Sequence, residues 1–271
     1  MNMFRRLSLK ALGVNIENSA SITNLLAKKV LQKMGMNDQN SVFQAIRKYY
    51  RKLGGRIRLV ASNSFNGEDL VLAKYLPETN GSYLDIGSGH PKLGSNTWLF
   101  YNRGWSGITI DPLKKMHRLH LARRSRDKQF NVCITNLESS EKTVNFYQYP
   151  ADEYSTTSES RYLELLTRGE KPNSVIKVVT LKIRSLGLAT TPLEPYLLDI
   201  DTEGNELSIL ESIDWNLFKP RVIAIEEWES PIYVPTAVRN YLEKLGYALE
   251  SRTVVTSIYV HREYLATREF N

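Results

Sequence analysis

The segment YLDIGSGHP, residues 83–91, combines residue types that suit a binding site for a nucleotide-like ligand. An apolar run ends at Asp85 and breaks into a turn that carries Gly87 and Gly89. Glycines allow a ligand to approach the backbone closely, and a helix that starts after such a turn offers free N–H groups. Asp111 ends the next apolar run, 24 positions after Gly87, where an acidic side chain can bind ribose hydroxyls. The sequence therefore predicts a nucleotide-like cofactor at this turn.

The details of the turn separate two classes of cofactor. A dinucleotide fingerprint has the pattern GxGxxG, and Lys92 occupies the place of its third glycine. Asp85 suits a cofactor with a cationic sulfonium and ammonium better than one with a pyrophosphate. Both details favour S-adenosylmethionine over NAD, and an ordinary strand-to-helix turn is the alternative to either.

Acidic residues gather where two predicted strands end. Asp199, Asp201 and Glu203 stand at alternate positions of the segment 196–204, and Glu226 ends the next apolar run. Crowded carboxylates either keep a proton, with a raised pKa, or hold a hard cation such as Mg²⁺. We expect Asp201, Glu203 or Glu226 to handle an acceptor hydroxyl, and Asp199, Asp201 and Glu226 to be the candidate metal ligands. For Glu203 the alternative is a plain helix start, which favours acids.

Two further polar features lie close to these segments in the sequence. His90 follows the glycine turn, and an imidazole suits proton transfer at neutral pH, so it is a candidate base. A turn histidine that only binds the backbone is an equal alternative. The polar stretch STT, residues 155–157, is a candidate contact for an acceptor sugar, and solvated hydroxyls are the alternative.

From residue 62 onward, short apolar strands alternate with helical segments, which predicts a largely parallel sheet. The segment 247–264 predicts an antiparallel hairpin at the end of the sheet. The expected strands are residues 82–87, 106–112, 130–136, 196–204 and 221–228, followed by this hairpin.

The N-terminal segment differs from the rest in charge. Residues 1–60 hold 12 Lys and Arg against Glu17 and Asp38, a net charge of +10. We predict a basic helical extension over 1–60 and one α/β domain over 61–271. Such an extension suits contact with an anionic surface, either membrane or nucleic acid, and a solvated helical face is the alternative.

The composition of the chain indicates the cellular compartment in which the protein is expected. There is no run of about 18 apolar residues, as a membrane span needs, and no apolar signal segment near the start. Cys133 is the single cysteine, so an internal disulfide is excluded. The expectation is a cytoplasmic protein that can associate peripherally with a membrane through its basic extension. The oligomeric state is not indicated.

Five motifs in order carry a resemblance to a known family. NGEDLVL, YLDIGSGHP, SNTWLFYNRGWSGITIDP, DIDTEGNELSIL and VIAIEEWES cover roughly residues 62–230 and together resemble the FkbM family of S-adenosylmethionine-dependent methyltransferases. The resemblance implies a Rossmann-like class I methyltransferase fold, α/β, with a mostly parallel seven-stranded sheet and an antiparallel last strand. It also implies action on hydroxyls of sugars, polysaccharides or polyketides. By resemblance, Asp85, Gly87 and Gly89 line the cofactor, Asp111 holds its ribose, and Glu68 lies near its methionine end.

The function predicted from the sequence is methyl transfer from S-adenosylmethionine to a hydroxyl of a saccharide or glycan-linked acceptor. One alternative is a ribose methyltransferase that binds RNA through residues 1–60. Against it, the end of the 196–204 segment is acidic, repels phosphates, and lacks a lysine beside the acceptor. A binding protein of the same fold without catalysis is a second alternative, and a NAD-linked oxidoreductase is disfavoured by Lys92.

Overall fold

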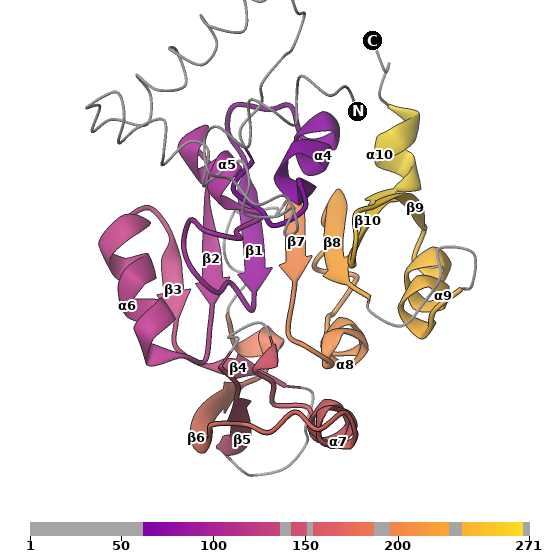
Figure 1. Cartoon of the computed structure of the whole chain (residues 1–271). Helices are drawn as coiled ribbons and strands as arrows, with labels where there is room; N and C mark the ends of the chain where they lie inside the picture. Colours follow the sequence, from indigo (N-terminus) through magenta and orange to yellow (C-terminus); the bar gives the residue numbers. More distant parts are fainter. Residues whose placement is uncertain (1–61, 136–141, 151–153, 187–195, 228–234, 268–271) are drawn as a thin grey trace, which may run out of the picture. The chain divides into compact units, whose positions relative to one another are not determined.

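The computed structural model describes residues 62–135, 142–150, 154–186, 196–227 and 235–267. These residues contain a seven-stranded sheet with the strand order β3-β2-β1-β7-β8-β10-β9 (Figure 1). The strands are β1 (Ser82–Ile86), β2 (Ser106–Ile110), β3 (Lys128–Phe130), β7 (Leu197–Ile200), β8 (Val222–Glu226), β9 (Tyr247–Arg252) and β10 (Thr256–His261). The first five run parallel, and β10 is antiparallel to both β8 and β9. The predicted fold class, a mostly parallel sheet with an antiparallel C-terminal hairpin, is confirmed.

Helices cover both faces of this sheet. They are α4 (Glu68–Tyr75), α5 (Trp98–Asn102), α6 (Lys114–Arg123), α8 (Glu206–Glu211), α9 (Ala237–Lys244) and α10 (Arg262–Ala266). Side chains alternate between the faces along each strand. Leu84 and Ile86 pack in one buried cluster with Leu242 of α9, and Tyr83 packs in the other with Phe100 of α5. Because both faces are apolar, the central strands are buried on both sides, as in other parallel sheets.

The expected strand over residues 130–136 is wrong in its extent. β3 ends at Phe130 in the large sheet, and Cys133 and Ile134 form β4 (Cys133–Ile134) in a separate sheet of order β4-β6-β5. Between them, the side-chain amide of Asn131 donates to the carbonyl oxygens of Asp111 and Pro112, both at 2.9 Å. These bonds hold the chain at the end of β2, where it leaves one sheet for the other.

The small sheet belongs to a long insertion between β3 and β7. It contains β5 (Thr143–Gln148), α7 (Glu159–Thr167), β6 (Ser174–Leu181) and the 3-10 turn η3 (Ile183–Leu186). Figure 1 shows α7 and the small sheet beside the carboxyl end of β7, near α8. The Thr156 hydroxyl, ahead of α7, donates to the Glu203 carbonyl at 2.7 Å, so the insertion is fastened to the segment after β7.

The predicted helical extension over residues 1–60 lies outside the described residues, and the domain division stays a prediction. None of the helices in the described part of the chain has the length and apolar character that a membrane crossing requires.

Gly87 is required by the packing of two strand ends. Its φ is +83°, and a Cβ placed on it would lie 1.7 Å from the carbonyl oxygen of Asp201. The chain leaving β7 therefore presses against the backbone at the end of β1. Gly169 has nearly the same backbone conformation, φ +84°, but a Cβ there would meet no atom of the described part of the chain within 4 Å.

This pair gives a matched test of the fold. Gly169→Ala should lower the free energy of unfolding by about 1 kcal/mol, the cost of a left-handed conformation for alanine. Gly87→Ala should cost more than about 3 kcal/mol, because the clash with Asp201 adds to that strain. Chemical denaturation of both variants measures the difference. Equal losses would show that the close approach of the two strand ends is not as described.

Candidate functional site

The glycine turn is fastened to the end of β2 by its backbone. The amides of Gly87 and Ser88 donate to the Ile110 carbonyl at 2.9 and 3.0 Å, and the amide of Gly89 donates to Asp111 Oδ2 at 3.0 Å. Asp111 Oδ1 accepts from the amide of Leu113 at 2.7 Å. Since an ionised carboxylate accepts up to about four hydrogen bonds, these contacts are compatible with ribose hydroxyls as further donors. Asp111 and the turn lie side by side, as the sequence analysis expected.

The two glycines of the turn have different surroundings. Whereas Gly87 faces the Asp201 carbonyl, a Cβ on Gly89 would find, among the residues that the structure describes, no neighbour nearer than the Gly87 oxygen at 4.0 Å. A ligand can therefore approach the backbone at Gly89. The sequence predicted that a ligand approaches the backbone at Gly87. In the structure the backbone of Asp201 lies there instead.

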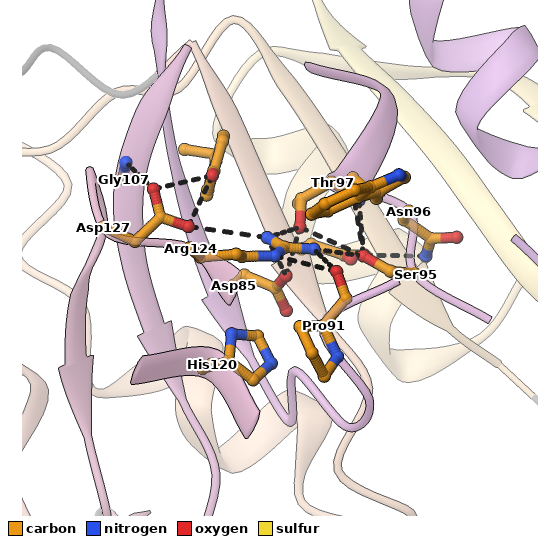
Figure 2. A network of polar contacts seen from close by, with 12 residues as sticks. Asp85, Pro91, Ser95, Asn96, Thr97, Gly107, His120, Arg124 and Asp127 are labelled. Atoms are coloured by element: carbon orange, nitrogen blue, oxygen red, sulfur yellow. Dashed lines mark hydrogen bonds and ion pairs between the residues drawn. The ribbon is translucent and has the colours of Figure 1, made fainter. Parts of the chain in front are cut away.

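Asp85 is buried in a network of polar side chains (Figure 2). The Thr97 hydroxyl donates to its Oδ2 at 2.5 Å, and Arg124 Nη1 lies 4.0 Å away. Burial raises the pKa of Asp85 to about 6, while Arg124 and the Thr97 bond act in the opposite direction. Arg124 thus provides a cation of the protein's own beside Asp85, and the contact of this acid with the cofactor stays a prediction.

Asp199 is the counterpart of Asp85 on the neighbouring strand. The two are register partners on β1 and β7, and Asn96 Nδ2 donates to Asp199 Oδ1 at 3.1 Å. Burial, and then the nearby charge of Asp85, raise the pKa of Asp199 well above its usual range. Burial of this kind disfavours the ionised form of the carboxyl group.

Three other acids converge at the carboxyl ends of β7 and β8. Carboxylate oxygens of Asp201, Glu203 and Glu226 all lie within 4.8 Å of one another. These are the three acids that were expected to handle the acceptor hydroxyl, whereas the expected metal set had Asp199 in place of Glu203. β7 ends at Ile200, before Asp201 and Glu203, so the alternation of side chains that was predicted for 196–204 does not continue to these two acids. Glu203 instead adopts a left-handed conformation, φ +56°, in the following turn.

Asp201 has the electrostatic properties of a base suited to neutral pH. Removal from water raises its pKa to about 7, and the carboxylates of Glu206 and Asp85 add to the rise. A hydrogen bond with Glu226 acts against it. Asp201 nevertheless retains exposed surface, whereas Glu203 and Glu226 are buried. A substrate can therefore reach Asp201, whose pKa lies near 7.

Arg161, from α7 of the insertion, places a positive charge beside this acidic group. Its Nη2 lies 3.7 Å from Glu203 Oε2, and its Nη1 donates to Glu164 Oε2 at 2.8 Å. Sequence reasoning missed Arg161, since no motif marks it. The hydroxyl-rich stretch 155–157 was expected to meet an acceptor sugar, but Thr156 is fully buried and bonded to the Glu203 carbonyl. That stretch fastens the insertion to the acidic group.

Glu68 lies within the electrostatic reach of the same acids, because its charge contributes to the raised pKa of both Asp199 and Asp201. It is buried at the start of α4. Its Oε1 accepts from the Thr253 hydroxyl and its Oε2 from the amide of Asn66, both at 2.8 Å. Glu68 thus joins α4 to the connection between β9 and β10 at the edge of the candidate site.

The His90 ring, expected to act as a base, is hydrogen-bonded to the backbone of the turn that follows it. Its Nδ1 accepts from the amides of Lys92 at 3.1 Å and Leu93 at 3.0 Å. The ring proton therefore sits on Nε2, and neither nitrogen has a lone pair available for a substrate proton. Partial burial, and then the charges of Arg123 and Lys115, lower the pKa of His90 below its usual value. The geometry corrects the prediction of a base and supports the alternative of a turn histidine.

Comparisons with known proteins identify the family. The family model described as the methyltransferase FkbM domain matches residues 85–249. A methyltransferase from Geobacter sulfurreducens, at 9% identity and a TM-score of 0.38, aligns over 95% of this chain and 96% of its own. The O-methyltransferase TomG from Streptomyces achromogenes, solved with SAM, aligns over 96% and 99% at 11% identity and a TM-score of 0.34. No curated protein matches the chain significantly. Since the family model covers more than half of the sequence, the chain belongs to the FkbM family of S-adenosylmethionine-dependent methyltransferases.

Proposed function

We propose that the protein transfers a methyl group from S-adenosylmethionine to a hydroxyl of a saccharide or glycan-linked acceptor. The observation that carries the proposal is Asp201, an exposed acid with a pKa raised to about 7, next to Glu203 and Glu226. Because a hydroxyl must lose its proton as it attacks, a base with a pKa near the working pH is the group that this reaction needs. Carboxylates are also good acceptors for the hydrogen bonds of sugar hydroxyls.

The donor site is proposed to extend from Asp111 across Gly89 to the acids at the ends of β1 and β7. Asp111 binds the ribose, and Gly89 leaves room for the nucleoside beside the backbone. Asp85, Gly87 and Glu68 shape and support the wall of this site through the contacts described above. When bound, the cofactor supplies a methyl carbon that is already activated, so the protein's part is to position the acceptor and accept its proton.

A divalent cation such as Mg²⁺ fits the acidic group by donor type and spacing. Asp201, Glu203 and Glu226 would hold it through their carboxylate oxygens, and it would orient vicinal sugar hydroxyls and lower the pKa of one. Arg161 lies 3.7 Å from Glu203 and already offsets part of the negative charge. The negative charge of this group can therefore be offset either by a bound cation together with Arg161 or by Arg161 alone. Treatment with a chelator distinguishes the two cases.

RNA is the less favoured acceptor. Phosphates are repelled by carboxylates, and three acids gather at the ends of β7 and β8, where we propose that the acceptor binds. The basic residues 1–60 that could bind RNA, or another anionic surface such as a membrane, lie outside the described residues. Cytoplasmic location and peripheral membrane association are likewise proposed on the sequence alone.

Replacing Asp111 tests the donor site. Asp111→Ala should weaken S-adenosylmethionine binding at least tenfold in calorimetry, since charged hydrogen bonds to the ribose contribute about 1.5–3 kcal/mol. Asp214→Ala is the matched control, because this exposed aspartate also accepts from the amide two residues ahead, that of Asn216 at 3.0 Å. Unchanged affinity in the Asp111 variant would remove its assigned role.

The raised pKa of Asp201 predicts a pH dependence of donor binding. A cationic sulfonium favours the ionised carboxylate, so S-adenosylmethionine affinity should rise as pH increases from about 6 to about 7.5, by up to about tenfold for one proton released. S-adenosylhomocysteine lacks the sulfonium charge and should show a flatter profile. Asp201→Asn should remove the difference between the two ligands. If the affinities of the unmodified protein for the two ligands change with pH in the same way, Asp201 does not lie close to the sulfonium.

A methyl-acceptor screen with labelled cofactor tests the reaction itself. Sugar nucleotides and glycolipid precursors should become labelled, RNA should not, and Asp201→Asn should reduce turnover by about 100-fold or more, as loss of a general base does. Each assay is run with and without EDTA. Activity lost on chelation and restored by Mg²⁺ assigns the cation, whereas full activity in EDTA rejects it. Label in RNA alone, or binding without any transfer, would contradict the proposal.

A further inference from the structure

Arg124 follows α6 directly, and its side chain is completely buried. Its Nε and Nη2 both donate to the Pro91 carbonyl, at 2.9 and 2.7 Å. Its Nη2 also donates to the Ser95 hydroxyl at 2.6 Å, and its Nη1 to the Thr97 hydroxyl at 2.8 Å. Figure 2 shows these bonds spreading from one guanidinium to both ends of the segment 91–97, which continues the glycine turn toward α5.

The surroundings of Arg124 neutralise its charge inside the protein. Asp127 lies 3.6 Å and Asp85 4.0 Å from Nη1. The rings of Trp98 and Tyr101 lie 5.6 and 5.8 Å from the guanidinium carbon, within the range of cation–π attraction. A buried charge is costly unless it is paired and hydrogen-bonded, and here both conditions are met. The guanidinium therefore has one defined position, and so do the groups that it binds.

A second side chain of α6 holds the turn itself. His120 lies four residues before Arg124, one helical turn away, and is buried. Its Nε2 is 3.1 Å from the Gly89 carbonyl, an acceptor, so this nitrogen carries the proton. Burial, and then the charge of Arg124, lower the pKa of His120 to about 4, which keeps the ring neutral at physiological pH. Gly89 is thus fixed through its carbonyl by His120 and through its amide by Asp111.

We infer that Arg124 is a positioning residue for the methyl donor: with His120 it clamps the carbonyls of Pro91 and Gly89, and this fixes the turn against which the cofactor binds. The inference rests on the proposed placement of S-adenosylmethionine beside Gly89 and Asp111. It gives Asp85 a second role, because this acid, together with Asp127, orients the guanidinium that shapes the turn.

The shape of the guanidinium suits this clamp. It presents a planar set of five N–H donors, which allows two bonds to one carbonyl while two hydroxyls are held at its other edge. A lysine keeps the positive charge but offers a single donor centre at the end of a flexible chain. The exchange of arginine for lysine therefore removes the geometry of the clamp and leaves most of the charge balance in place.

The test compares Arg124→Lys with Arg126→Lys. Arg126 is the matched control: it follows two residues later, lies 3.8 Å from the Tyr101 ring centre and donates to the carbonyls of Tyr101 and Trp105, neither of which belongs to the turn. Titration calorimetry with S-adenosylmethionine should show a loss of affinity of at least about tenfold for Arg124→Lys and less than about threefold for Arg126→Lys. Both are measured below the onset of thermal unfolding.

A kinetic readout separates positioning from general loss of structure. With an acceptor from the methyl-transfer screen, Arg124→Lys should raise the KM for S-adenosylmethionine at least about tenfold, while kcat and the KM for the acceptor change less than about threefold. Partial unfolding would lower kcat instead. Should Arg124→Lys fail to fold, Thr97→Val, which removes one hydroxyl of the clamp, should weaken cofactor binding severalfold, and Thr97→Ser should preserve it.

Two results overturn the inference in distinguishable ways. If the unmodified protein binds S-adenosylmethionine and folded Arg124→Lys, or Thr97→Val in its place, binds it equally well, the positioning role fails while the proposed function stands. If the unmodified protein does not bind S-adenosylmethionine at all, the proposed donor site fails and the inference fails with it.

Discussion

The crowding of carboxylates at the ends of β1, β7 and β8 is the physical constraint on which the rest of the site depends. Asp85 and Asp199 are register partners inside the sheet, and Asp201, just after β7, meets Glu226, the last residue of β8. Such a group is stable only where protons or cations offset its charge. Two arginines offset part of this negative charge. Arg124 lies 4.0 Å from Asp85, and Arg161, from α7 of the insertion, lies 3.7 Å from Glu203.

The fold was largely readable from the sequence, because apolar strands alternating with helices leave few arrangements. The prediction failed where single polar contacts redirect the chain. Asn131 separates β3 from β4, and the turn at Glu203 ends an alternation that appeared to continue past Ile200. In both places the decisive partner is distant in sequence or depends on backbone conformation, so periodicity alone could not reveal it.

The sequence identified most residues of the candidate site by their type, but it did not show what each of them contacts. Gly87 and Gly89 look equivalent in sequence, yet a Cβ on the first would clash with the Asp201 carbonyl, and one on the second would meet no described atom closer than 4.0 Å. His90 looked available, but two backbone amides occupy its Nδ1. Arg124 stands close to Arg123 and Arg126, and only the folded chain shows that it reaches Pro91. Burial and partner choice are tertiary properties, which spacing does not encode.

The bond from Thr156 to the Glu203 carbonyl connects two parts of the protein that lie far apart in the sequence. Glu203 keeps an unfavourable left-handed backbone, and the segment that holds it there comes from the insertion between β3 and β7. A change in that insertion would therefore reach beyond the insertion itself, because it would alter how Glu203, and with it the group of Asp201, Glu203 and Glu226, is held.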